Sequence, residues 1–308
     1  MIKEDRIAII GQPGMIVSAI AGRLRKDGFQ NLLLMTPDEL DLTAQNVVHN
    51  LFQKEKPAFV FLTSVKTGGI IANRSYPADF IFRNLQAQTS TIDAAYRSGV
   101  PKLLYLGSSC MYPRDCPQPM KEEYLLSGKL EPTSEPYAIA KIAGLIMCQS
   151  YNRQYGTNFI GAISADLYGP EDDFDTVTSH VLPALLRRMY EAKTGGEKEV
   201  TIWGTGNPKR EFLHVDDLAS ACVFLMKNYK DTQVINIGFG NDTAIKDLAT
   251  IIKKVVGFEG DLVFDTTKPD GTPRKFLDSS RIFKMGWVPK IGLEKGIENT
   301  YRWYLSHS

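Results

Sequence analysis

The sequence predicts an α/β protein built on a doubly wound parallel sheet. Short aliphatic and β-branched runs alternate with longer helical segments through the first 165 residues, and turn-forming or polar residues follow each run. Strands that alternate with crossover helices form a parallel sheet. Ligands of such sheets bind beyond the carboxyl ends of the strands, so we expect the functional residues to lie there.

Apolar runs and helical periodicity predict the elements in order. The expected strands are 6–10, 32–35, 58–62, 102–106 and 158–165, and the expected helices are 18–27, 45–54, 80–98, 136–155 and 181–192. We take the strand at 102–106 as the fifth of the sheet. The alternation stops after 168–170, and the turn-rich loop 268–274 is typical of a smaller domain. We therefore expect a main domain of 1–165 plus about 212–240, and a smaller one of about 166–211 plus 241–308.

Charge and cysteine content argue against several classes of partner. Lys and Arg total 36 against 35 for Asp and Glu, so no basic field is available for nucleic acid or for a membrane surface. The charged start and the short apolar run after it predict neither a signal peptide nor a membrane span, and hence a cytosolic protein. The four cysteines lack metal-site or disulfide-framework spacing. We expect a small-molecule ligand and no metal.

A glycine-containing loop, residues 11–17, lies between the first strand and the first helix. Glycines there let the backbone approach a pyrophosphate, and the helix N-terminus stabilises its charge. However, Val17 stands where a third glycine is expected, and Pro13 removes a backbone donor. A dinucleotide site and an ordinary glycine turn remain equally consistent with the loop. The candidate cofactor contacts are Gly11, Gly14, Met15, Ile16 and, after the second strand, Asp41.

Tyr137 and Lys141 form a Tyr-x-x-x-Lys unit near the start of a predicted helix. Residues four apart point from the same helix face, so the ammonium is expected to lower the phenol pKa from about 10. Tyr137 would then donate a proton as a nicotinamide hydride reduces a carbonyl, and Lys141 would also hold the nicotinamide ribose. The alternative is a packed tyrosine beside a solvated lysine. The position of the unit, about 30 residues after the strand at 102–106, favours the catalytic interpretation.

Hydroxyls and a thiol follow that strand in the segment 107–112. Ser108 would donate to a substrate carbonyl oxygen and share its developing charge with Tyr137, although serines at such positions also cap turns. Cys110 is either a small core residue or, with a histidine in reach, a base that removes a proton from carbon.

In these residues and in several longer segments, the chain resembles the extended short-chain dehydrogenase/reductases over nearly its whole length. Within them it is similar to the branch that acts on GDP-4-keto-6-deoxy-mannose. The segments that carry the resemblance are Gly107 to Cys110, Glu131 to Thr133, Glu135 to Lys141, Ser150 to Gly156, His180 to Arg188 and Arg210 to Asp217.

The resemblance implies two reactions at one site, epimerisation at C3 and C5 followed by reduction at C4, giving GDP-L-fucose. Cys110 would remove the acidic protons next to the ketone, and His180 would return a proton to the opposite face. Tyr137 would serve as the acid of the reduction, with Ser108 and Lys141 supporting it. Without the family, His180 is better interpreted as a helix-start capping residue.

The resemblance also implies a nucleotide-sugar site under the smaller domain and a dinucleotide site on the main one. The candidate substrate contacts are Arg188, with Arg187 as a close alternative, Trp203, Arg210 and Lys275. His214, Asp216 and Asp217 are interpreted as helix-capping residues. The family implies a homodimer through the helices 80–98 and 136–155.

Departures from the family concern the cofactor and the sugar. Pro13 and Val17 depart from the family's loop, and Met35 and Pro37 stand where the family has arginines for the 2′-phosphate of NADPH. NADPH is therefore expected only because the family uses it, and NADH is the alternative cofactor. Asp166 stands where an asparagine is common, which would suit an altered sugar.

Three other interpretations remain. The chain would act as a reductase or epimerase of a related GDP-4-keto sugar, for example a heptose. A sugar 4,6-dehydratase is disfavoured, because that chemistry needs an Asp-Glu pair where this chain has Ser109 and Cys110. A non-catalytic nucleotide-binding scaffold is motivated by Val17 and Pro13.

Overall fold

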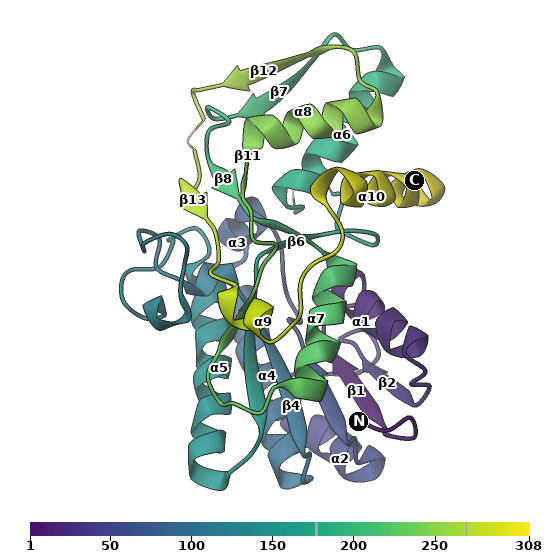
Figure 1. Ribbon diagram of the computed structural model, residues 1–308, viewed down its shortest axis with the longest axis vertical. Coiled ribbons are helices and arrows are strands. Elements are labelled where there is room, and N and C mark those ends of the chain that lie inside the picture. The colour runs from purple at the N-terminus through teal and green to yellow at the C-terminus, as the bar shows by residue number, and fades with distance from the viewer. Residues whose placement is uncertain (176–177, 269) are drawn as a thin grey trace.

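The computed structural model describes residues 1–175, 178–268 and 270–308. Its main sheet has six parallel strands in the order β10-β5-β4-β3-β1-β2 (Figure 1). The strands are β1 (Ile7–Ile10), β2 (Leu32–Met35), β3 (Phe59–Leu62), β4 (Lys102–Ser108), β5 (Phe159–Ser164) and β10 (Ile235–Ile237). The chain changes direction between β1 and β3, which opens a crevice at their carboxyl ends. The predicted fold class is confirmed.

Helices cover both faces of the sheet. On one face α1 (Met15–Lys26) packs against α7 (Val215–Asn228), and on the other α4 (Pro77–Arg97) packs against both α2 (Gln45–Glu55) and α5 (Glu135–Tyr155). The helix expected at 18–27 begins three residues earlier, because it starts directly after Gly14. Counting the strand before Ser108 as the fifth was wrong: it is β4, since the chain between β3 and β4 is helical. Part of that helical stretch, α3 (Ile70–Ser75), was not anticipated.

A second group of elements lies over the carboxyl edge of the sheet, at the top of Figure 1. Small sheets there join β11 (Thr243–Ala244), β8 (Lys209–Arg210) and β13 (Arg274–Lys275), and pair β12 (Asp261–Asp265) with β7 (Glu199–Trp203). β6 (Asp166–Tyr168) pairs with β9 (Phe212–His214). The remaining helices are α6 (Val181–Gly195), α8 (Ile245–Val256), α9 (Ser280–Lys284) and α10 (Leu293–His307). In the predicted loop 268–274, residue 269 lies outside the described residues.

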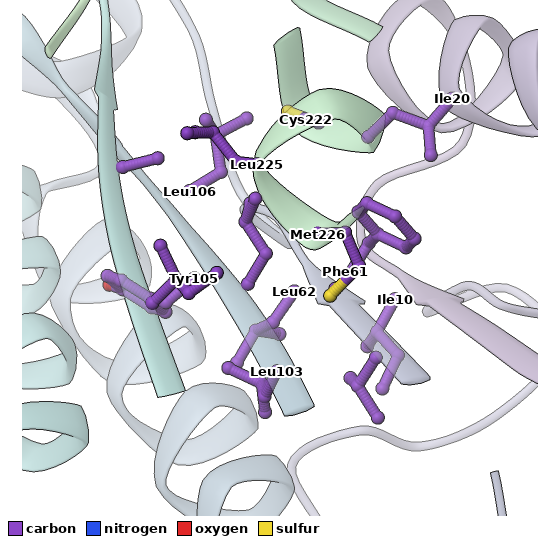
Figure 2. Close-up of a cluster of buried hydrophobic side chains, with 14 of the residues drawn as sticks. Ile10, Ile20, Phe61, Leu62, Leu103, Tyr105, Leu106, Cys222, Leu225 and Met226 are labelled. Atoms are coloured by element: carbon purple, nitrogen blue, oxygen red, sulfur yellow. The ribbon is translucent and has the colours of Figure 1, made fainter. Parts of the chain in front are cut away.

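The core follows from the strand sequences. β1 and β5 are buried along their whole length, as expected for parallel strands covered on both faces. Figure 2 shows Leu106 and Phe61 of the sheet lying close to Leu225 and Met226 of α7. Burying each such side chain contributes about 1.5–3 kcal/mol. A separate apolar cluster joins α6, α8, α10 and β7. Among the described residues, no helix is long and apolar enough to cross a membrane.

A close contact between α5 and β4 fixes the helix that carries the Tyr-x-x-x-Lys unit. The buried Tyr105 hydroxyl lies 2.7 Å from Gln88 Oε1 and 3.0 Å from the Lys141 carbonyl oxygen. Gln88 in turn donates to the Ala140 carbonyl at 2.5 Å. A Cβ at Gly144 would approach the Tyr105 hydroxyl to 2.5 Å, so only glycine allows this approach.

We predict that Gly144→Ala lowers the free energy of unfolding by about 1–3 kcal/mol, because the added methyl overpacks the contact with Tyr105. Gly22→Ala is the matched control, since Gly22 is also helical but has open space around its Cα. The control should gain about 0.5–1 kcal/mol. Urea denaturation followed by circular dichroism measures both, and equal effects of the two changes would contradict the contact.

Candidate active site

Tyr137 reaches the region where the strands end, whereas the Lys141 ammonium lies over the ring of Tyr105 within β4. The Tyr137 hydroxyl lies 2.9 Å from Ser64 Oγ, just beyond β3. Lys141 is 1% exposed, and its ammonium lies 4.2 Å from the centre of the Tyr105 ring. Burial lowers the pKa of Lys141 to about 7.

The expected lowering of the Tyr137 pKa is wrong for this structure. Burial, and next the Cys110 thiol, raise the pKa of Tyr137 above its usual value, although the Ser64 hydrogen bond opposes them. The physical reason is desolvation, which disfavours the tyrosinate in this enclosed position. A phenol that stays protonated at neutral pH is still suited to donate a proton.

Ser108 and Cys110 lie at the end of β4 and in the short 3-10 helix η1 (Ser109–Met111) that follows. Ser108 Oγ accepts a hydrogen bond from the Cys110 backbone N–H at 3.5 Å, so this serine also caps η1. The Cys110 side chain is partly exposed. Burial raises the pKa of its thiol, while Lys275 and the Ser108 hydrogen bond favour the thiolate.

Asp166, the first residue of β6, is the centre of an ionic cluster next to Cys110. Its Oδ1 accepts from Lys275 Nζ at 3.1 Å and from Ser109 Oγ at 3.3 Å, and its Oδ2 lies 3.8 Å from Arg210 Nε. Burial opposes ionisation, but Lys275 and Arg210 outweigh it and hold the pKa of the Asp166 carboxyl below its usual value. The cluster therefore joins the β4 end to β8 and β13.

His180 directly precedes α6, and its side chain makes no capping hydrogen bond to that helix. The ring is accessible to solvent but is flanked by protein, which lowers its pKa by desolvation. Asp166 partly opposes this effect, whereas Lys275 adds to it. His180 and Cys110 thus interact with the same Asp166–Lys275 pair.

The glycines of the loop after β1 allow it to pack closely against neighbouring segments of the chain. A Cβ at Gly11 would lie 1.8 Å from Thr63 Oγ1, and Gly14 has a φ of 110°. Val17 is buried and packs in the core in place of the expected glycine, while Pro13 is exposed. The Met15 N–H, which begins α1, donates to the Glu171 carbonyl at 3.1 Å. Glu171 therefore lies against the start of α1, beside Gly14 and the predicted cofactor contacts Met15 and Ile16.

The segment after β2 is acidic and carries no arginine. Met35 is buried and Pro37 exposed. Asp41 Oδ1 accepts from the Thr43 N–H at 3.0 Å and from the Thr43 hydroxyl at 2.6 Å, and these bonds lower its pKa. The exposed Asp41 carboxylate is therefore an ionised acceptor on this side of the crevice.

The remaining predicted contacts fall into two groups. Arg210 joins the ionic cluster and also donates to the Thr272 carbonyl at 2.6 Å. Arg188 instead donates to the Thr201 carbonyl on β7, and Trp203 at the end of β7 is 58% exposed. Arg187 pairs with Glu191 along α6, which leaves Arg188 as the arginine that faces β7.

His214 is a capping residue, as predicted, because its Nδ1 accepts from the Asp216 N–H at the start of α7. Interpreting Asp217 as a cap was wrong. Its carboxylate accepts from the backbone N–H groups of Lys290 and Ile291, at 3.0 and 2.8 Å. Asp217 thus ties the chain ahead of α10 to α7.

Sequence reasoning missed Ser64 and Glu211. Ser64 is a polar residue at a strand end, a signal of the kind that identified Ser108. Glu211 is 1% exposed and accepts from Gly240 N–H at 2.8 Å and from Leu277 N–H at 3.0 Å. Burial raises its pKa to about 7. No local pattern predicts this role, because the partners lie 29 and 66 residues away.

A parallel sheet with a glycine loop at its crevice and a Tyr-x-x-x-Lys unit beside a strand-end serine defines a nicotinamide-dependent enzyme of the short-chain dehydrogenase/reductase type. The model of the NAD dependent epimerase/dehydratase family matches residues 7–238, and the chain belongs to this family.

Relatives and a solved structure match nearly the whole chain. It is 54% identical to GDP-L-fucose synthase 1 of Arabidopsis thaliana, over 99% of this chain and 94% of that one. It is 49% identical to GDP-L-fucose synthase of Escherichia coli (strain K12), over 99% and 98%. MlghC, a GDP-mannoheptose C4 reductase from Campylobacter jejuni with NADP bound, is 43% identical with a TM-score of 0.91, covering 99% of both chains.

We predict that Lys141→Met raises the free energy of unfolding relative to wild type, and that this gain shrinks as the pH rises from 7 to about 10. Below pH 7 folding buries a charged lysine. Between the folded pKa of about 7 and the usual 10.5 the unfolded state binds more protons, so wild-type stability rises across this window. Urea denaturation at several pH values measures the difference. For the exposed Lys268→Met the difference should not change with pH; a pH-independent gain for Lys141→Met would contradict the burial argument.

Proposed function

We propose that this enzyme epimerises GDP-4-keto-6-deoxy-mannose at C3 and C5 and then reduces its C4 ketone, giving GDP-L-fucose. The observation that carries the proposal is the juxtaposition of two sets of groups at one strand edge. Tyr137 and Ser108 suit carbonyl reduction, while Cys110 and His180, which interact with the same ion pair, suit proton removal and return. Relatives at 49–54% identity over almost the full chain carry the name of this activity.

In the epimerisation, the Cys110 thiolate takes the proton from the carbon next to the ketone. The electron pair of that bond moves into the enolate, whose negative charge rests on the C4 oxygen and is stabilised by the hydroxyls of Ser108 and Tyr137. His180 donates a proton to the opposite face of the carbon. Inversion requires two groups, because a single group would return the proton to the face it came from.

In the reduction, the bound nicotinamide supplies a hydride to C4. Tyr137 donates its phenol proton to the C4 oxygen, and Ser64 lies at hydrogen-bond distance to hold the hydroxyl in place. Ser108 polarises the same oxygen. Burial lowers the pKa of Lys141 to about 7; the charged fraction of Lys141 would stabilise the tyrosinate left after transfer, and Lys141 would hold the nicotinamide ribose.

The substrate's nucleotide and diphosphate are assigned to cations and an aromatic ring above the sheet. These residues are Arg188, Trp203, Arg210 and Lys275. Arginine and lysine suit a diphosphate, and the indole ring offers a packing face and a donor. We further propose that residues 1–165 plus about 212–240 form the dinucleotide-binding domain, and about 166–211 plus 241–308 the substrate domain. The separate apolar cluster of α6, α8 and α10 supports this division, whereas Leu277, Ile282 and Trp287 of the substrate part pack into the cluster of the main sheet.

NADPH is the proposed cofactor, and NADH is the second candidate. The NADP-bound heptose reductase, 43% identical, supports NADPH. The segment after β2 favours NADH, because Met35 and Pro37 offer no cation to a 2′-phosphate and Asp41 is an acceptor suited to a ribose hydroxyl.

A related GDP-4-keto sugar, such as a heptose, is the second candidate substrate. The reductase from C. jejuni supports it, as does Asp166, whose carboxylate is a stronger acceptor for a sugar hydroxyl than an amide. The presence of both Cys110 and His180 favours epimerisation with either sugar.

We also propose a homodimer formed through α4 and α5. Four large hydrophobic side chains are exposed on these two packed helices: Phe82 at 56%, Tyr155 at 46%, Ile139 at 43% and Ile146 at 39%. Ile139 and Ile146 are seven residues apart and so lie on one face of α5. A cytosolic location is supported by the four free cysteines, which suit a reducing compartment.

The decisive experiment is a product assay with GDP-4-keto-6-deoxy-mannose in D₂O, with NADPH or NADH, read by NMR. We predict GDP-L-fucose with deuterium at C3 and C5.

Tyr137→Phe should reduce C4 at least 100-fold more slowly but still exchange both carbon-bound protons. Cys110→Ser should lose the exchange yet still reduce the ketone in part. Failure of the wild-type enzyme to bind either cofactor would refute the proposal, and unchanged exchange in Cys110→Ser would refute the role of the thiol.

A charged residue introduced on the exposed face of α5 tests the proposed dimer. We predict that Ile146→Glu shifts the protein towards monomers in light scattering, because a glutamate in the shared face would be buried without a partner. Val288→Glu is the matched control, since Val288 is 53% exposed and lies outside α4 and α5. Loss of the dimer in both variants, or in neither, would argue against this interface.

A further inference from the structure

Lys275 lies in a short chain of contacts that begins next to Cys110. Ser109, the neighbour of Cys110, donates to Asp166 Oδ1, and Lys275 Nζ donates to the same oxygen. One carboxylate oxygen therefore fixes the distance between the Lys275 ammonium and the backbone that carries the thiol. Lys275 itself is held on β13, whose backbone pairs with β8.

The titratable groups that face Cys110 come from four elements. They are Tyr105 of β4, Tyr137 and Lys141 of α5, Asp166 of β6 and Lys275 of β13. The phenols are neutral near pH 7. Lys275 affects the thiol more strongly than either Asp166 or Lys141 does. The Asp166–Lys275 pair therefore acts on Cys110 as a net positive charge, although it is formally neutral.

We propose that Lys275, held in place by Asp166, is the positioning residue that stabilises the Cys110 thiolate and so makes this cysteine a base. This role of Lys275 is additional to its proposed contact with the diphosphate. Only its consequence for catalysis rests on the proposed function. Arg210 and His180 also face Asp166, but neither is paired with the oxygen that Ser109 shares with Lys275.

The consequence for the reaction is that Lys275 opposes the effect of burial, which raises the pKa of the Cys110 thiol, and so increases the fraction that is thiolate. The thiol releases its proton to solvent, and the thiolate then takes the carbon-bound proton while the bonding electrons move to the C4 oxygen. The two partners of the ion pair act in opposite directions. Lys275 favours the thiolate, and the Asp166 charge disfavours it.

The test is the pH profile of Cys110 alkylation by iodoacetamide in the free protein, followed by mass spectrometry. Cys116, Cys148 and Cys222 are buried, and Cys110→Ser gives their background rate. Because only the thiolate reacts, Lys275→Met should move the midpoint up by about 1 pH unit and slow alkylation near neutral pH by about tenfold. Lys275→Arg should restore the wild-type profile, and Lys268→Met should leave it unchanged.

Asp166→Asn gives the sharper outcome. Asparagine keeps an acceptor oxygen for Ser109 and Lys275 but removes the negative charge, so the midpoint should fall. If the ion pair had only a structural role, Lys275→Met and Asp166→Asn would shift the alkylation midpoint in the same direction. A Lys275→Met profile equal to wild type, or an upward shift in Asp166→Asn, overturns the proposal. No substrate or cofactor is needed, so its failure is distinct from failure of the product assay; circular dichroism of each variant confirms that it is folded.

Discussion

The contact between Tyr105 of β4 and the backbone of α5 is the constraint on which the catalytic geometry depends. One buried hydroxyl reaches both Gln88 and the Lys141 carbonyl, and Gly144 allows the helix to come this close. The same strand ends at Ser108. The groups on α5 and after β4 that we propose for the reduction are therefore held together by contacts within the main domain.

The groups proposed for epimerisation are placed differently. Cys110 belongs to the β4 end, whereas Asp166, Arg210 and Lys275 of the neighbouring ionic cluster come from β6, β8 and β13 of the small sheets. Buried Glu211 strengthens this junction by accepting from backbone groups near Gly240 and Leu277. The ionic cluster lies where the main domain meets the smaller one, and packing there removes its charges from water. Each such charge needs a partner of opposite sign, which explains why the cluster contains both signs.

Much of the fold could be predicted from the sequence, because parallel strands buried on both faces are continuous apolar runs. The runs at 32–35 and 58–62 are confirmed as strands to within a residue. The glycine loop was ambiguous in sequence, and Val17 is accommodated because its side chain packs into the core. Helix α3 was missed because its six residues are too few to show a helical apolar period, although Pro77 marks the start of the helix that follows.

The sequence by itself determined the Tyr-x-x-x-Lys unit, the strand-end serine and cysteine, and the sheet, because these depend on spacing within one element. Only the tertiary structure decided the ionisation of these groups. Burial raises the pKa of Tyr137 and lowers that of Lys141, and the pairing of Asp166 with Lys275 spans 109 residues. Desolvation and ion pairing depend on which distant segments meet, and no local pattern encodes that.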